Sequence, residues 1–179
     1  KIKINTFYLE KKIRDFVLNH PSKKNIEVIS DGKNILGTGG GIFNLMNSTD
    51  EDNFLIFNPD TYWNLNYLQA VNKMCDMYFK HEMENCLLIV DKKKSYDLRL
   101  NGDFGMSGNT LYNENKNYIY TGCQIINKKL FNGFSKKFFS VSEIWNKKLN
   151  QNDLYGEDSK EEFIHLTDLE IYNKLLENN

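Results

Sequence analysis

The chain has 179 residues, of which 40% are hydrophobic and 26% charged, and its 23 basic residues nearly balance its 24 acidic ones. This length predicts a single folded domain, residues 1–179, and the balanced charge argues against a nucleic-acid-binding protein. No apolar run approaches the length of a membrane span, and three cysteines without a CxxC pair indicate neither a disulfide framework nor a zinc ribbon. We therefore expect a cytoplasmic protein with reduced thiols.

The first half of the chain alternates strands and helices. Short apolar runs predict strands at 2–4, 26–29, 54–57 and 86–90. Apolar spacing predicts a helix at 8–18 with a face of Leu9, Ile13, Phe16 and Val17, and a helix at 65–79 with a face of Leu65, Leu68, Val71, Cys75, Tyr78 and Phe79. The run at 54–57 is apolar throughout, which is typical of a strand buried on both faces. This alternation predicts an α/β fold with a doubly wound parallel sheet.

After Asp91 the predicted segments become shorter. They indicate antiparallel strands at 104–106, 110–112 and 118–126, with weaker strand signals at 154–155 and 163–164. Two further helices are predicted by capping boxes, in which a serine or threonine is followed three residues later by a glutamate. These boxes are Ser140 with Glu143, for a helix to about Leu149, and Thr167 with Glu170, for a helix to Leu176.

A glycine-rich stretch, residues 37–41, stands where a helix should begin. Each glycine costs roughly 0.5–1 kcal/mol relative to alanine within a helix, so such a run is expected where side chains would block a close approach. The free N–H groups of a helix N-terminus would then face an anion or a polar ring. The stretch is not a GxGxxG fingerprint, because Ile42 occupies the last glycine position, and no Walker lysine follows. Ligand contact and a plain tight turn remain alternatives.

Carboxylates follow several predicted strands. Asp60 comes directly after the run at 54–57, where open α/β sheets bind ligands, and a lone carboxylate there can hold Mg²⁺ together with substrate phosphates. The alternative role is an Asx-type cap of the next helix. Asp103 either faces a ligand or belongs to a turn. Near the last weak strand, His165 is a structural residue or a ligand, and Asp168 favours the N-terminus of the last helix.

Together these stretches resemble the single-domain sugar-1-phosphate nucleotidyltransferases, above all the N-acetylmuramate-1-phosphate uridylyltransferase and mannose-1-phosphate guanylyltransferase branch. Residues 38–42 resemble the end of the Glu-Thr-Gly-Gly-Gly-Ile motif of that branch, with Gly37 in place of the acid. The other similar stretches are Asn5-Thr6-Phe7-Tyr8-Leu9 (Asn-Thr-His-His-Leu in the branch), Phe57-Asn58-Pro59-Asp60 (Val-Asn-Gly-Asp), Gly102-Asp103-Phe104-Gly105 (Gly-Asp-Phe-Gly) and Tyr120-Thr121-Gly122 (Phe-Ser-Gly). Their order and spacing cover most of the chain.

The resemblance implies a Rossmann-like nucleotide-diphospho-sugar transferase fold, with a mixed, mostly parallel sheet flanked by helices. The family transfers a nucleotidyl group from a nucleoside triphosphate to a sugar 1-phosphate and releases pyrophosphate, with Mg²⁺ neutralising phosphate charge. By resemblance, the catalytic residue and metal ligand is Asp60. The resemblance further implies nucleotide contacts by Gly37, Thr38, Gly39, Gly40 and Asn58, and sugar contacts by Asp103, Gly122 and Glu143.

Two departures from the family pattern matter. The family's first strand, with its Gly-x-Gly-x-x-Arg loop and lysine that grip the triphosphate, has no counterpart, and Lys1 falls where the second strand should be. We expect that this strand–loop–helix unit, roughly 30 residues or more, was lost from the chain or lies outside it, and that the chain as written is inactive.

The second departure is at the family's Trp-x-Asp, which Phe163-Ile164-His165 replaces. Histidine is a poorer magnesium ligand than a carboxylate. His165 then contacts the ion or a phosphate, or Asp168 substitutes for the missing carboxylate, or Asp60 works with water. The alternative function is a non-catalytic, nucleotide-sugar-binding or regulatory homologue.

Overall fold

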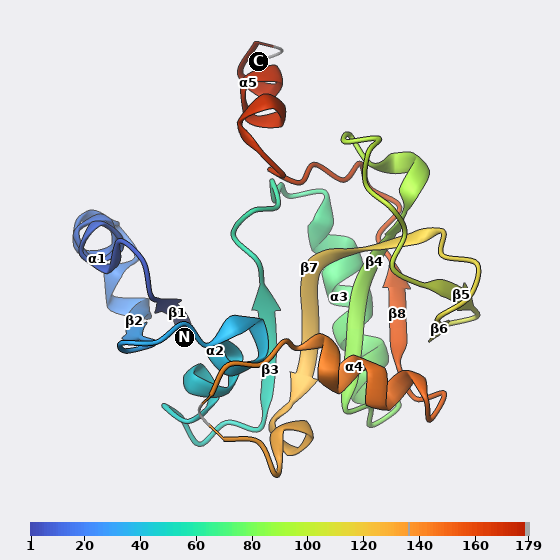
Figure 1. Ribbon diagram of the computed structural model, residues 1–179, viewed down its shortest axis with the longest axis horizontal. Coiled ribbons are helices and arrows are strands. Elements are labelled where there is room, and N and C mark those ends of the chain that lie inside the picture. Colours follow the sequence, from blue (N-terminus) through green and yellow to red (C-terminus); the bar gives the residue numbers. More distant parts are fainter. Residues whose placement is uncertain (136, 178–179) are drawn as a thin grey trace. The chain divides into compact units, whose positions relative to one another are not determined.

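The computed structural model describes residues 1–135 and 137–177. The chain divides into two compact units (Figure 1). Unit 1 comprises Lys1–Asp52 and Phe131–Asn146, and unit 2 comprises Asn53–Leu130 and Lys147–Asn179. Each unit has its own sheet. The boundary falls within helix α4 (Ser142–Leu149).

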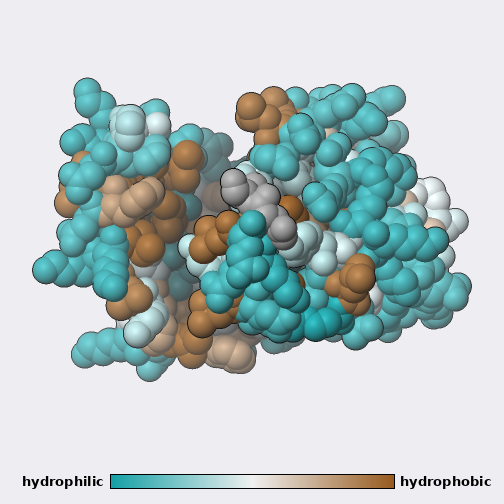
Figure 2. All heavy atoms as spheres, turned by 90° about the horizontal axis from the view of Figure 1, so that it is seen from above, coloured by the Kyte–Doolittle hydropathy of each residue, from teal (hydrophilic) through white to brown (hydrophobic). Residues whose placement is uncertain are grey.

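Unit 1 is built on a two-stranded parallel sheet with two helices packed on it. Strand β1 pairs with β2, and α1 packs on β2 while α2 packs on β1. Its elements are β1 (Ile2–Thr6), α1 (Glu10–Asn19), the 3₁₀ turn η1 (Lys23–Asn25), β2 (Ile26–Ser30) and α2 (Gly37–Met46). The predicted face of α1 is wrong except at Val17, because Leu9, Ile13 and Phe16 are 47%, 37% and 67% exposed. On the left of Figure 2, where Figure 1 places α1 and β1, apolar side chains lie among hydrophilic ones.

Unit 2 is built on a six-stranded mixed sheet in the order β3-β7-β4-β8-β6-β5. Strands β4 and β8 are parallel, and the other neighbouring pairs are antiparallel. Its elements are β3 (Asn53–Phe57), α3 (Tyr67–Lys80), β4 (Asn85–Asp91), η2 (Lys92–Lys94), β5 (Gly105–Ser107), β6 (Thr110–Tyr112), β7 (Tyr118–Asn127), β8 (Tyr155–Asp158) and α5 (Leu169–Glu177), with η3 (Lys128–Phe131) at the boundary. The predicted α/β class with a mixed sheet is confirmed. The prediction of a doubly wound parallel sheet is wrong for unit 2, because long β7 lies antiparallel between β3 and β4.

The core of unit 2 lies between α3 and the central strands β4 and β7 (Figure 1). The buried stripe of α3 consists of Tyr67, Ala70, Val71, Met74 and Tyr78, which meet Cys86 and Leu88 of β4 and Cys123 and Ile125 of β7. The predicted face is partly wrong, because the helix begins at Tyr67 and its stripe follows from that residue. Leu65 and Leu68 are 87% and 57% exposed as a result.

Strand β3 stands at one end of the strand order, with β7 as its partner. The prediction of burial on both faces is wrong, because Leu55 is 43% and Phe57 46% exposed. An apolar run specifies a strand, but it does not specify whether the strand lies in the middle of a sheet or at its edge.

The helix starts test the two predicted capping boxes. At α4, Glu143 Oε1 accepts a hydrogen bond from Ser140 N at 3.4 Å, so the first prediction is confirmed. At α5, Asp168 Oδ1 accepts from Ile171 N at 3.0 Å, so the cap is Asp168 and the prediction of Thr167 is wrong by one residue. The Thr167 hydroxyl instead lies 3.2 Å from His165 Nδ1. Across the described ranges, no helix has the length and apolarity required to cross a membrane.

Candidate functional site

In unit 1, α2 begins within the glycine-rich stretch, as predicted. A Cβ on Gly39 would lie 2.3 Å from the Phe139 ring, and one on Gly40 would lie 2.4 Å from Lys137 O. The N–H groups of both glycines donate to Phe139 O, at 3.0 and 3.3 Å. The close approach of residues 137–141 therefore requires these glycines without any ligand, and it already occupies their amides.

At the same helix start, Thr38 is exposed and Gly37 is partly buried. Gly37 has a φ of 69°, in the left-handed region that favours glycine. The hydroxyl of Thr38 accepts from Val141 N at 3.1 Å and lies 3.5 Å from Ser140 Oγ. The start of α2 thus meets the start of α4, where the Glu143 carboxylate serves as a cap.

Sequence reasoning missed Asp31, which organises the polar interior of unit 1. Its carboxylate, in a residue only 7% exposed, accepts from Asn5 Nδ2 and Asn44 Nδ2, both at 2.9 Å. A Cβ on Gly41 would lie 2.7 Å from Asn5 Nδ2. One carboxylate therefore fixes the ends of both strands against α2. Its position after a strand was visible in the sequence, but its two amide partners were not.

In unit 2, a bulge in β7 meets the end of β3. Strand β7 has two extra residues, Thr121 and Gly122, between the partners of Leu88 and Ile89. Gly122 has a φ of 92°, and its carbonyl accepts from Asn58 N at 2.8 Å. A Cβ on Gly122 would lie 2.9 Å from Asn58 Cβ. Bulges of this kind are frequent beside active sites, where they redirect the chain.

The structure brings Asp60 and His165 together. Residues 60–62 and 164–166 run antiparallel, with Leu166 N donating to Asp60 O at 2.7 Å. His165 Nε2 then lies 3.5 Å from Asp60 Oδ2. The hydrogen bond from His165 lowers the pKa of Asp60, and the same bond raises the pKa of His165. The Asp60 side chain remains 49% exposed, so it is a charged and accessible carboxylate.

These side chains are the donors that a metal ion would meet at this site. Among residues 1–135 and 137–177, no three His, Cys, Asp or Glu residues gather as a metal site. One accessible carboxylate nevertheless fits Mg²⁺, which takes one or two protein carboxylates and completes its shell with water and phosphates. Imidazole suits softer metals, and a protonated His165 competes with a cation for Asp60. Asp168 is already bonded to Arg99 Nη2 at 2.9 Å and caps α5.

Asp103 forms a hydrogen bond with the backbone of β7 just before the bulge. Its Oδ2 accepts from Tyr120 N at 2.8 Å, and burial raises the pKa of this carboxyl. Cβ atoms on Gly102 and Gly105 would lie 2.1 and 2.2 Å from carbonyl oxygens of residues 114–116. The Gly-Asp-Phe-Gly motif therefore combines close backbone packing with one hydrogen-bonded carboxylate.

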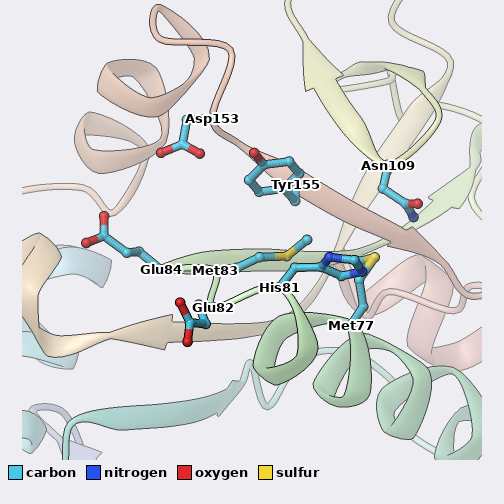
Figure 3. Close-up of a pocket in the computed structure, with 8 residues that line it drawn as sticks. All are labelled: Met77, His81, Glu82, Met83, Glu84, Asn109, Asp153 and Tyr155. Atoms are coloured by element: carbon cyan, nitrogen blue, oxygen red, sulfur yellow. The ribbon is translucent and has the colours of Figure 1, made fainter.

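A cavity of about 490 Å³ elsewhere in unit 2 contains none of the predicted site residues (Figure 3). It is lined by Met77, His81, Glu82, Met83, Glu84, Asn109, Asp153 and Tyr155. The carboxylates of Glu84 and Asp153 both accept from Lys148 Nζ, at 2.7 and 2.6 Å. Burial opposes the charge of Lys148, but these two bonds together outweigh it and raise its pKa. Two of the cavity's carboxylates thus stabilise a buried lysine.

No protein-family model and no curated protein matches this chain in sequence. Several solved structures match it in fold. HddC from Yersinia pseudotuberculosis complexed with GMP-PN superposes with a TM-score of 0.74 and 21% identity, over 99% of this chain and 78% of that one. Apo UDP-glucose pyrophosphorylase gives a TM-score of 0.71 and 10% identity, over 98% and 81% of the two chains. Inositol-1-phosphate CTP transferase from T. maritima gives a TM-score of 0.63 and 17% identity, over 87% of this chain and 65% of that one.

At these identities the likeness concerns the fold. The α/β arrangement of this chain is shared with sugar-phosphate nucleotidyltransferases, as the motifs in its sequence led us to expect. The chain therefore has a nucleotidyltransferase fold.

Proposed function

We propose that this protein transfers a nucleotidyl group from a nucleoside triphosphate to a sugar 1-phosphate, giving a nucleotide sugar and pyrophosphate. The observation that carries the proposal is the accessible carboxylate of Asp60 at the end of β3, beside the bulge at Gly122. Open α/β sheets bind ligands at such strand ends. The shared fold supports the same conclusion, and the three free thiols of Cys75, Cys86 and Cys123 support a cytoplasmic location.

Within unit 2, Asp60 would hold Mg²⁺, which when bound supplies charge neutralisation for the phosphates. Protonated His165 would hold the Asp60 carboxylate in place until a cation binds Asp60 or a phosphate binds His165. Gly122 would contact the sugar through its backbone, while its missing side chain makes room for Asn58, which would bind the nucleotide. Asp103 would contact the sugar while fixing the backbone at Tyr120.

Within unit 1, the exposed Thr38 and the partly buried Gly37 would contact the nucleotide at the helix start. Gly39 and Gly40 would contribute mainly by their lack of side chains, because their amides are bonded to Phe139 O. Glu143 would assist the sugar from the start of α4. The acceptor phosphate is itself the nucleophile, so no residue has to remove a proton, and positioning supplies most of the catalysis.

The test is pyrophosphate release with Mg²⁺ by a form of the protein that carries the triphosphate loop, across nucleoside triphosphates and sugar 1-phosphates, beginning with GTP and mannose 1-phosphate, which the resembled branch uses. Nucleotide-sugar binding is measured by calorimetry beside it, because the triphosphate loop has no counterpart in this sequence. Asp60→Asn keeps the shape of the side chain and should lower turnover at least about a hundredfold. Asp50→Asn, at an exposed position of unit 1, is the control. Unchanged turnover in Asp60→Asn would contradict the role of Asp60.

A second candidate function is nucleotide-sugar binding without catalysis. The observation that favours it is His165, which stands where the resembled family has a carboxylate and which pairs with Asp60 at 3.5 Å. His165→Asp separates the two candidates. In a form of the protein that carries the triphosphate loop, an enzyme should gain or keep turnover in this variant, whereas a binding protein should bind the nucleotide sugar and release no pyrophosphate with either residue at position 165.

A further inference from the structure

A second cavity in unit 2, of about 300 Å³, lies against α5. Its inner wall comes from the antiparallel pair formed by residues 60–62 and 164–166. Side chains alternate along such a pair. Thr61 turns inward and donates to Thr121 O at 2.7 Å, whereas its neighbour Tyr62 lines the cavity. The cavity therefore lies on the face of this pair opposite to the β7 bulge.

The walls of this cavity are mostly aromatic and aliphatic. Three tyrosines line it, each from a different segment: Tyr62, Tyr96 and Tyr172. Ile164 and Leu166 contribute aliphatic surface between them. Aromatic rings carry negative potential on their faces, so several rings around one space attract a cation while their bodies still contact apolar groups.

The charged residue on the cavity wall is negative, like the faces of the tyrosine rings. Glu162 is the charged side chain on its wall. Within the part of the chain that the structure describes, its carboxylate forms no hydrogen bond or ion pair, and only its main-chain oxygen is bonded, by the Tyr67 hydroxyl at 2.7 Å. The cations nearby are engaged: Lys174 binds Glu170 at 2.6 Å, and Arg99 binds Asp168 at 2.9 Å. The cavity thus has one exposed carboxylate, Glu162, that has no ion-pair partner among the described residues.

We propose that this cavity binds a small organic cation with a methylated ammonium group. The methyl groups would pack on the tyrosine rings and on Ile164, and the positive charge would interact with the ring faces and with Glu162. The volume lies at the lower end of the range of small-molecule pockets, roughly 300–1,000 Å³, which suits such a group better than a nucleotide. None of the residues assigned above to nucleotide, metal or sugar lines this cavity, so the proposal does not depend on the proposed reaction.

The experiment compares choline with its neutral isostere 3,3-dimethylbutan-1-ol, which has the same shape without the charge. Binding of each to the whole chain is measured by calorimetry and by ligand-detected NMR. Choline should bind saturably and at least about tenfold more tightly than the alcohol. Equal affinities, or no saturable binding of choline, would overturn the proposal.

Two variants locate the site. Tyr172→Leu removes one ring from the exposed side of α5, where Tyr172 is 45% exposed, and should weaken choline at least about fivefold. Glu162→Gln keeps the size of the side chain and should weaken choline about threefold or more without affecting the alcohol. The controls are Tyr8→Leu, at a tyrosine that is 79% exposed in unit 1, and Glu51→Gln, at an exposed glutamate of unit 1. Choline affinity that is unchanged in both test variants, or reduced equally by the controls, would overturn the assignment.

Discussion

The glycine run of unit 1 and the single glycine in the β7 bulge of unit 2 meet different physical requirements. Gly39 and Gly40 lie in a helix, and what they provide is space for Phe139 and for the backbone at Lys137. Gly122 provides both space beside Asn58 and a φ of 92° that other residues adopt at a cost. A glycine-rich motif by itself is therefore explained by packing within the chain as well as by a ligand.

The two regions also differ in the polar groups that remain free to bind a ligand. In unit 1, the amides of Gly39 and Gly40 are already bonded to Phe139 O. In unit 2, Asp60 keeps half of its side chain exposed and has an imidazole as its ion-pair partner. A group that is charged, accessible and weakly held marks a ligand site better than a group whose bonds are complete, so the functional proposal depends more on unit 2.

The largest effect is expected for Gly122→Ala, which combines backbone strain with a contact 2.9 Å from Asn58 Cβ. We expect a loss of about 3 kcal/mol in the free energy of unfolding, measured with denaturant. Gly133→Ala is the matched control, because its φ of 85° gives similar strain while nothing lies within 4 Å of the new Cβ. The control should lose about 1 kcal/mol. Equal losses would mean that crowding at Asn58 contributes nothing.

In unit 1, Gly39→Ala gains helix propensity but forces a methyl group against the Phe139 ring. Overpacking should outweigh propensity and leave a net loss of about 2 kcal/mol in the free energy of unfolding. The double variant Gly39→Ala/Phe139→Leu should recover part of this loss, because the smaller side chain makes room. If Gly39→Ala alone stabilises the protein, the space beside Gly39 is open and becomes available to a ligand.

A smaller effect is expected where the starts of α2 and α4 meet. Ser140→Ala removes the hydroxyl that accepts from Ser142 N at 3.3 Å and lies 3.5 Å from Thr38 Oγ1. The loss of this cap should lower the free energy of unfolding by about 1 kcal/mol. Ser107→Ala, at an exposed position of β5, should change it little. Similar changes in the free energy of unfolding for the two variants would show that the Ser140 cap does not stabilise the protein.

The smallest effect concerns the pair of Asp60 and His165. The raised pKa of His165 stabilises the folded state below its unfolded pKa, near 6.5, and this contribution is lost as the pH rises through the folded pKa. The lowered pKa of Asp60 acts in the other direction, since its contribution is lost in acid, below about pH 4. Between these two pH values the pair should contribute about 0.5 kcal/mol to the free energy of unfolding, a small value because both side chains are partly exposed. The variant His165→Asn should abolish this pH dependence.

The same pair reports on the metal. If Asp60 binds Mg²⁺, the cation competes with the imidazolium, so Mg²⁺ should lower the pKa of His165 observed by NMR. Sodium chloride at equal ionic strength is the control for screening. A pKa that does not respond to Mg²⁺ beyond this control would argue against metal binding at Asp60.

Local patterns in the sequence predicted most of the elements, because apolar spacing and caps act over a few residues. The helix at Gly37–Met46 and the cap of α4 by Ser140 and Glu143 are of this kind. The position of β7 between β3 and β4 was not predictable, because that pairing joins residues such as Phe57 and Cys123 that lie far apart in the chain.

At the candidate site the limit of prediction was similar. Asp60 was found from its position after a strand, and its pairing with His165 depends on a contact between distant segments. Asp31 was missed because its importance comes from Asn5 and Asn44, neither of which is its neighbour in sequence. The cap of α5 was misplaced because Thr167 and Asp168 are both good caps, and the contact of Thr167 with His165 leaves the role to Asp168.

The position of β3 at one end of the strand order in unit 2 has a consequence for handling the protein. The strand reads Asn53-Phe54-Leu55-Ile56-Phe57, with no charge and no proline, and it exposes Leu55 and Phe57. Within the described sheet of unit 2, β3 has one strand partner, and an end strand with exposed apolar side chains is a template for intermolecular strand addition and aggregation. Purified protein should therefore self-associate least when dilute. The substitution Leu55→Lys should slow aggregation during storage, because it places a charge on the strand.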